Sequence, residues 1–314
     1  MTPSTRARLI AAAAFPLLLI NLNRAQAAPQ KAVTPVTSLA TPEVRMDHIS
    51  IVTMGKGSPV ILIPGLACPR AVYDDFTAEL AKTHQVILVQ VNGFGGDDAG
   101  ANLKPGILNG IVADLDAYIA TNKLKNVAVV GHSMGGLVGL MLARAHPTDV
   151  AKLMVVDSLP FFAVLFAPPG VDPTPAMVAP QAAKMRDGVA ANYGKPLSPE
   201  AAEAQTRGLA IKPASIVRMK LWAAGADARV TGEAMYEDLT TDLRPDLSSI
   251  RTPITLVYPW NASGPAKDMV DPFYRKQYAT VPHITYVDIG DAGHMVMLDQ
   301  PEAFAKALAG FLAS

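Results

Sequence analysis

The 314-residue chain is poor in cysteine, charge and aromatic side chains. Its one cysteine, Cys68, excludes an intrachain disulfide and a metal site of paired cysteines, and we expect it to face the core. Charged residues make up 17% of the chain, with 27 basic side chains balancing 27 acidic ones. Without a basic patch, nucleic acid is not an expected partner. Because half of the residues are apolar, a large buried core can supply the stability.

The chain has no apolar run long enough to span a bilayer comfortably. Residues 9–20 form an apolar stretch of about a dozen residues, whereas a membrane helix needs about 20. Arg6 and Arg8 precede this stretch, and Ala25-Gln26-Ala27 offers small residues for cleavage. We predict that residues 1–27 are a secretory signal peptide, so that the mature protein is periplasmic or secreted with no stable membrane insertion. The alternative is an uncleaved anchor or a lipid attachment.

Motifs of metal and nucleotide sites are also missing. The sequence contains no His-Glu-x-x-His, no paired cysteines and no phosphate-binding loop. Residues 93–98 are rich in glycine and follow a strand-like run, but Asp98 stands where a dinucleotide-binding loop needs its third glycine. We therefore expect neither a metal ion nor a cofactor.

Strand-like and helix-like segments alternate after a leader, residues 28–42, that is rich in alanine, proline, threonine and serine and that we expect to be flexible. The expected strands are 44–54, 59–64, 85–91, 127–130, 152–156, 254–258 and 284–289, and the expected helices are 107–121, 137–145, 272–279 and 301–312. Strands separated by helical patterns predict an α/β fold, a doubly wound and mostly parallel sheet with helices on both faces.

This alternation stops after Leu159. Residues 159–250 contain no clear strand, but prolines and glycines followed by alanine-rich and methionine-containing helical stretches. Residues 43–158 and 251–314 carry the α/β pattern on either side. We therefore predict one α/β core, with a helical cap inserted between its two parts.

The stretch Gly131-His132-Ser133-Met134-Gly135-Gly136 follows a short valine-rich strand and precedes an apolar segment of helical composition. In this context the pattern Gly-x-Ser-x-Gly indicates a serine held on a sharp turn, because the glycines permit close backbone contacts and unusual dihedral angles. The helix after the turn directs its first amides at a developing oxyanion. We predict that Ser133 is a nucleophile and that the Met134 N–H is one oxyanion donor.

A second donor is expected from Ile63-Pro64-Gly65-Leu66, which follows another buried strand. Such a loop lies beside the serine turn in a doubly wound sheet, and Gly65 allows the chain to turn sharply there. The Leu66 N–H is the predicted second donor. The alternative is that this loop is a simple exit from the strand.

A serine hydroxyl needs a base, and the chain has six histidines. His294 lies in a flexible stretch, Gly290-Asp291-Ala292-Gly293-His294, between the last strand and the last helix. That loop leaves the sheet at the same edge as the serine turn, so we predict that His294 is the base. His132 adjoins the serine but points away from it, and the other four histidines are expected to be structural.

The acid that orients the histidine is less well determined by the sequence. Asp157 ends the strand after the serine's helix and is the first candidate. Asp268 and Asp271 lie after the next strand, although Asp271 before Pro272 resembles a helix cap. The remaining alternatives are Asn261 and the absence of any acid, and an asparagine can orient an imidazole without compensating its charge.

The cap begins with an apolar run that contains Phe161 and Phe162. Because this run directly follows the strand of Asp157, we expect both phenylalanines to line a substrate pocket together with Gly65 and His132. The alternative is that the apolar residues of the cap only bury it on the core. A pocket of this kind favours apolar acyl or alcohol groups over charged substrates.

With these residues the chain resembles the α/β-hydrolases that carry a helical cap. The residues behind the resemblance are Ile63-Pro64-Gly65-Leu66, Gly131-His132-Ser133-Met134-Gly135-Gly136, Asp157, Gly293-His294-Met295 and Asp299-Gln300-Pro301-Glu302-Ala303-Phe304. The resemblance implies a Ser-His-acid triad, two backbone oxyanion donors and hydrolysis through an acyl-enzyme. Pro64 and Asn261 depart from the family pattern, which often has a histidine and an aspartate there. The serine argues against the dehalogenase and epoxide hydrolase branches, which use an aspartate.

The sequence thus predicts an exported serine hydrolase, a carboxylesterase for small or medium apolar esters. Lactones, amides and thioesters are alternative substrates on the same fold. A ligand-binding protein with weak turnover is a further alternative, which Asn261 keeps open. The sequence assigns no oligomeric state.

Overall fold

The computed structural model describes residues 41–196 and 198–314. The predicted signal peptide, residues 1–27, and residues 28–40 of the expected leader lie outside the described residues. Within the described ranges, none of the helices combines the length and the apolar character that crossing a membrane requires.

The strands of the described part form one eight-stranded sheet in the order β1-β2-β4-β3-β5-β6-β7-β8. Their bounds are β1 Val44–Arg45, β2 Ile49–Met54, β3 Ser58–Ile63, β4 His84–Val91, β5 Val127–His132, β6 Val150–Val156, β7 Ile254–Trp260 and β8 Ile284–Gly290. β1 and β2 form an antiparallel hairpin, and β2 pairs antiparallel with β4. Every other pairing is parallel. The prediction of a doubly wound and mostly parallel sheet is confirmed.

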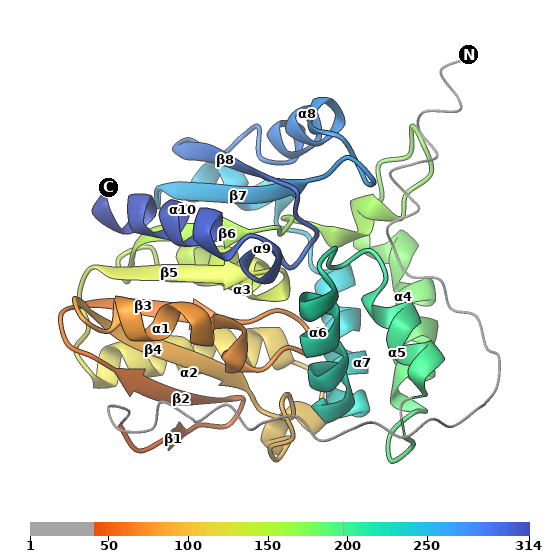
Figure 1. Cartoon of the computed structure of the whole chain (residues 1–314), viewed down its shortest axis with the longest axis horizontal. Helices are drawn as coiled ribbons and strands as arrows, with labels where there is room; N and C mark the ends of the chain where they lie inside the picture. The colour runs from red at the N-terminus through yellow and green to blue at the C-terminus, as the bar shows by residue number, and fades with distance from the viewer. Residues whose placement is uncertain (1–40, 197) are drawn as a thin grey trace.

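Helices cover both faces of this sheet (Figure 1). The helices of the core are α1 Asp74–Leu80, α2 Ile107–Thr121, α3 Met134–Ala145, α8 Lys267–Gln277, α9 Val296–Asp299 and α10 Pro301–Ala313. In Figure 1, α1 and α10 lie in front of the sheet and α2 and α3 lie behind it. The core strands are apolar on both faces for this reason: in β3, Val60 and Leu62 join the cluster under α1 and α10, whereas Ile61 and Ile63 join the cluster under α2 and α3.

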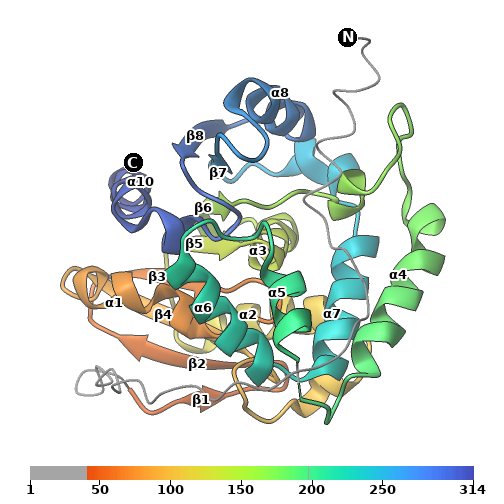
Figure 2. The ribbon, with the colours of Figure 1, turned by 45° about the vertical axis from the view of Figure 1, so that its right-hand side comes forward.

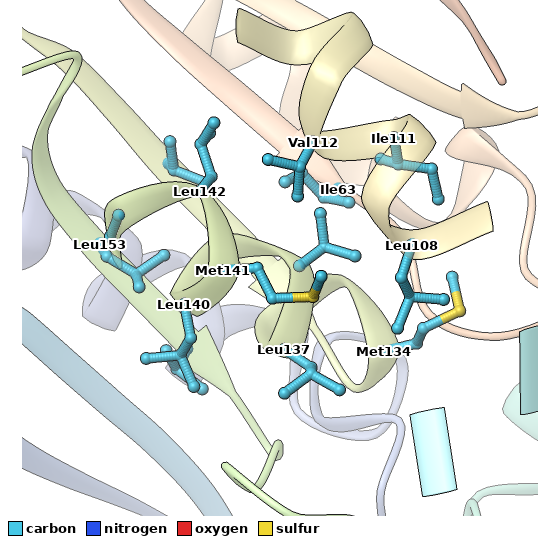
Figure 3. Packing of buried hydrophobic residues seen from close by; sticks show 14 of the residues in the cluster. Ile63, Leu108, Ile111, Val112, Met134, Leu137, Leu140, Met141, Leu142 and Leu153 are labelled. Carbon is cyan, nitrogen blue, oxygen red and sulfur yellow. The ribbon is translucent and has the colours of Figure 1, made fainter. Parts of the chain in front are cut away.

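The helix that follows Ser133 is buried over most of its length, because it packs against the sheet on one side and against the neighbouring α2 on another. Figure 3 shows the side chains of Leu108 and Ile111 on α2 toward Met134 and Met141 on α3, with Leu137 in the same core cluster. All five side chains are almost completely inaccessible to solvent. This contact fixes the start of α3, and with it the turn that carries Ser133.

The inserted helical cap lies between β6 and β7. It contains α4 Pro175–Ala190, α5 Pro199–Thr206, α6 Pro213–Gly225 and α7 Ala228–Thr240. Figures 1 and 2 show these helices beyond the end of the sheet, with α4 and α7 side by side. Thr174 and Ser198 cap α4 and α5 with their hydroxyls, and a proline follows each cap.

A carboxylate of the cap anchors it to the core. The Glu237 side chain, on α7, accepts hydrogen bonds from the amides of Gly106, Ile107 and Leu108 at the start of α2. Three converging N–H groups and the positive end of the helix dipole favour a negative charge at this point. Glu237 therefore joins the cap to the start of α2.

Two features of the core differ from the sequence prediction. The helix expected at 272–279 begins earlier, at Lys267, so Asp271 lies inside α8 and does not cap it. Pro272 is tolerated within α8 because Val270 and Tyr274 pack against the sheet and compensate for the lost backbone hydrogen bond. The short helices α1 and α9 were not predicted, since neither is long enough to give a clear apolar period.

Candidate active site

Ser133 lies between β5 and α3 in a backbone conformation that is rare for a residue with a side chain, with φ 54° and ψ −125°. The neighbouring glycines explain how this turn fits. A Cβ on Gly131 would stand 2.1 Å from the carbonyl oxygen of Gly135, and a Cβ on Gly135 would stand 2.4 Å from the carbonyl oxygen of Ile63. Such a strained, glycine-flanked turn is typical of a functional position. It presents the Ser133 side chain at the end of the parallel strands.

The loop after β3 passes directly beside Ser133. A Cβ on Gly65 would lie 3.0 Å from Ser133 Cβ and 2.9 Å from His132 Nδ1, so a glycine is needed there for close approach. We expected the sharp turn of this loop at Gly65. The residue with a positive φ is Ala67 instead, with φ 55°. The Cys68 N–H closes this turn on the Gly65 carbonyl oxygen. The Leu66 amide, in the middle of the turn, thus lies in a segment packed against Ser133.

The end of β6 brings a carboxylate to His294. His294 lies in the loop after β8, and Asp157 lies in the loop after β6. Nδ1 of His294 is 2.7 Å from Oδ2 of Asp157. Asp157 has φ 45°, and its side chain is 11% exposed. Its other oxygen, Oδ1, accepts a hydrogen bond from the hydroxyl of Tyr274 on α8. Asp157 is therefore held by two partners and presents a charge to one side of the His294 ring. Because this contact uses Nδ1, Nε2 is the nitrogen left for a substrate or a serine.

His132 packs against the same imidazole. Its ring centroid lies 4.6 Å from that of His294, and its Nε2 lies 2.9 Å from the His294 carbonyl oxygen. Burial and then the nearby charge of His294 lower the pKa of His132 to about 3. His132 therefore stays neutral and donates from Nε2, so it supports His294 and cannot take up the proton in its place.

The other candidates for the acid lie apart from His294. Asp268 is exposed in the first turn of α8. Asp271 pairs with Lys267 and accepts a hydrogen bond from the Tyr258 hydroxyl. Asn261 donates to the Ala292 carbonyl oxygen, so it tethers the backbone of the histidine loop and does not contact the imidazole.

The remaining predicted residues are all buried. Phe161 is fully buried with the Arg244 guanidinium 4.7 Å from its ring centroid, and Phe162 packs in the core cluster under α2 and α3. Met134 is fully buried at the start of α3, where helix amides have no intrahelical acceptor. Cys68 is buried as expected, and burial raises the pKa of its thiol to about 12, which leaves it unreactive at neutral pH.

Two contributors were not predicted, Tyr274 and Asp299. A tyrosine on an amphipathic helix carries no sequence signal of a role beside Asp157. Asp299 is fully buried and accepts a hydrogen bond from the Gly293 amide, next to His294. Asp299 stands in a stretch that resembles the α/β-hydrolases, but the sequence did not indicate a role for its side chain.

Among the described residues, one group could offer three ligands to a metal ion: Asp116, His146 and Asp149. His146 ends α3, the helix that begins after Ser133, and is thus about 18 Å away along the helix. The three side chains are each about a third exposed, and His146 pairs with Asp116 at 3.0 Å. We interpret the group as a surface ion pair.

Comparison with known proteins identifies the family of this chain. The model of the alpha/beta hydrolase family matches residues 60–307. The chain is 28% identical over 274 residues to the polyketide synthase ThaQ of Burkholderia thailandensis, a match that covers 82% of this chain but only 12% of the synthase. It is 25% identical over 261 residues to the pimeloyl-acyl-carrier-protein methyl ester esterase of Aliivibrio salmonicida, covering 83% of this chain and 94% of that protein.

Among solved structures, the fold is similar to that of a thermophilic esterase from Thermogutta terrifontis, with a TM-score of 0.69 and 22% identity. The superposition covers 87% of this chain and 98% of the esterase. At this identity the likeness supports the fold alone. The family match spans most of the chain and includes the turn at Ser133, the end of β6 and the histidine loop. This chain belongs to the alpha/beta hydrolase family.

Proposed function

We propose that this protein is a serine hydrolase, a carboxylesterase that cleaves small or medium apolar esters through an acyl-enzyme. The observation that carries the proposal is the 2.7 Å contact between His294 Nδ1 and Asp157 Oδ2, at the sheet edge where Ser133 occupies a strained turn. A carboxylate on Nδ1 fixes the tautomer that leaves Nε2 free to accept a proton. We further propose that the protein acts after export, with its signal peptide removed.

In the proposed mechanism, the Ser133 hydroxyl attacks the ester carbonyl and His294 Nε2 takes its proton. The imidazolium that forms is stabilised by the Asp157 carboxylate, which Tyr274 holds from the other side. The amides of Met134 and Leu66 donate to the oxyanion, and one such donor is typically worth about 3 kcal/mol of the barrier. His294 then protonates the leaving alcohol, and the acyl group remains on Ser133.

In the second half of the reaction, water takes the place of the alcohol. His294 removes a proton from the water, the resulting hydroxide attacks the acyl carbonyl, and the proton returns to Ser133 as the acid leaves. His132 takes no part in these transfers, because burial keeps it neutral. One histidine therefore serves as base and then acid in each half.

The substrate class follows from the apolar surroundings and the relatives. Phe161, Phe162 and Met134 are buried, and they make the protein interior at the start of the cap and at the start of α3 apolar. One relative, that of Aliivibrio salmonicida, has a name that identifies it as a methyl ester esterase. Both observations favour an uncharged ester as the substrate. Asn261 no longer supports the ligand-binding alternative, because it holds Ala292 and Asp157 is the residue beside His294.

The proposal is tested with p-nitrophenyl esters from acetate to octanoate, assayed beside a lactone, a thioester and an amide. We expect the highest kcat/KM on a short or medium ester, and loss of all turnover in Ser133→Ala. Ser249→Ala, an exposed serine far along the chain, is the control and should retain the activity. Turnover of the lactone, thioester or amide alone would contradict an esterase, and turnover that survives Ser133→Ala would contradict the serine mechanism.

A further inference from the structure

A carboxylate outside the proposed triad joins the cap to the histidine loop. Asp299, at the end of α9, is fully buried. Its Oδ2 accepts hydrogen bonds from the Gly293 amide at 2.9 Å and the Ile211 amide at 3.0 Å. Its Oδ1 accepts one from the Lys212 amide at 3.1 Å. We call these three bonds the clasp: one belongs to the residue before His294, and two belong to the cap segment between α5 and α6.

The backbone on the other side of His294 is attached to the same cap segment. The Met295 amide donates to the Leu209 carbonyl oxygen at 2.8 Å. A Cβ on Gly293 would lie 2.9 Å from that carbonyl oxygen, so the two segments are in close contact. Both neighbours of His294 in the chain are therefore connected to the cap. Met295 bonds to it directly, and Gly293 is connected to it through the Asp299 carboxylate.

We propose that Asp299 is a positioning residue, which holds the cap segment 209–212 and the backbone of His294 as one unit. This inference rests on the proposed function, because the position of His294 affects a rate only if His294 is the base. The clasp makes the cap part of the catalytic framework: displacement of residues 209–212 displaces the imidazole too. Errors of about 1 Å in such a group can cost about 100-fold in rate.

The charge of Asp299 suits this role. Three N–H groups converge on the two oxygens of this buried carboxylate, and hydrogen bonds to a carboxylate are about twice as strong as neutral ones. In Asp299→Asn one oxygen becomes an NH₂ group, which faces an N–H donor in either orientation. The substitution therefore removes at least one bond of the clasp without a change of size.

The experiment compares Asp299→Asn with Glu237→Gln in the full chain. Glu237 also anchors the cap by accepting three amide hydrogen bonds, but its partners are at the start of α2 and not in the histidine loop. The measurements are the rate constant for labelling of Ser133 by a fluorophosphonate, kcat and KM on the best ester, and the pH profile of kcat/KM. Thermal unfolding confirms that each variant is folded.

We expect Asp299→Asn to label at least about tenfold more slowly, with a lower kcat, a KM within about twofold and a shifted acidic limb of the pH profile. Glu237→Gln should stay within about twofold of the wild type and keep its pH profile, because the loss of a purely structural anchor does not move His294. The inference is overturned if Asp299→Asn reacts at the wild-type rate, or if Glu237→Gln loses as much as Asp299→Asn.

A second variant covers the case in which Asp299→Asn does not fold. Asp299→Ser keeps a small polar side chain, but its single hydroxyl oxygen cannot accept all three amide hydrogen bonds of the clasp and adds no volume. We expect labelling to be at least about threefold slower in Asp299→Ser, and an unchanged rate would overturn the clasp. A wild type that does not label at all would instead refute the proposed function, so the two failures are distinguishable.

Discussion

Asp157→Asn is expected to lower kcat on the order of 10⁴-fold while leaving the protein folded. Asparagine has nearly the same shape, but it cannot compensate the charge of the His294 imidazolium. It also has one NH₂ group to place between two partners, the Nδ1–H of His294 and the hydroxyl of Tyr274. Where the NH₂ faces His294, the imidazole adopts the tautomer that leaves Nε2 protonated. The measurement is steady-state hydrolysis of the best ester, with thermal unfolding of the same samples.

Asp268→Asn and Asp271→Asn are the matched controls for this prediction, because both aspartates lie on α8 near the same strand ends. Neither contacts His294, so we expect kcat within about threefold of the wild type for each, as is usual for changes outside a catalytic group. A near-normal rate for Asp157→Asn, or a loss in Asp271→Asn as large as in Asp157→Asn, would assign the acid elsewhere.

The second large effect concerns stability at acid pH. Burial lowers the pKa of His132 to about 3, whereas in the unfolded chain a histidine has an ordinary pKa near 6.5. Between these two values the unfolded state binds a proton that the native state does not. Neutral His132 therefore contributes its full stabilisation of the native state above about pH 6.5. As the pH falls below that value, the free energy of unfolding decreases by about 1.4 kcal/mol per pH unit. From pH 6.5 to 4 this contributes roughly 3 kcal/mol.

Urea unfolding of wild type and His132→Gln between pH 6.5 and 4 measures this contribution. The free energy of unfolding of His132→Gln should fall by roughly 3 kcal/mol less over that range. Other groups, such as buried Asp238, whose pKa burial raises to about 8, titrate in both proteins and cancel in the difference. His283→Gln, a substitution of an exposed histidine, should follow the wild type. Equal slopes for wild type and His132→Gln would show that His132 is protonated in the native state.

Much of the fold could be predicted because the strands of a covered parallel sheet are continuous apolar runs. The helix expected at 107–121 has the same bounds as α2, since its apolar residues keep a helical period and face the sheet. The prediction for α8 was poorer. There the sequence suggested a start at Pro272, whereas packing of Val270 and Tyr274 extends the helix back to Lys267.

The candidate site was predictable in part. Motifs identified Ser133 and His294, because a sharp turn and a late loop leave local sequence signals. The sequence favoured Asp157 as the partner of His294 but left the aspartates on α8 open, since the carboxylates after β6 and on α8 approach the same edge and only packing separates them. Tyr274 bonds to Asp157, which is 117 residues away in the chain, and Asp299 bonds to Ile211, which is 88 residues away. A single sequence gives no pattern for contacts between residues so far apart.

The most direct test of the central claim, that Ser133 is an activated nucleophile, is intact mass and peptide mapping after treatment with a fluorophosphonate. The account predicts one adduct on the Ser133 peptide of the wild type and none in Ser133→Ala. An adduct on another residue, or an unlabelled and correctly folded wild type, would contradict it.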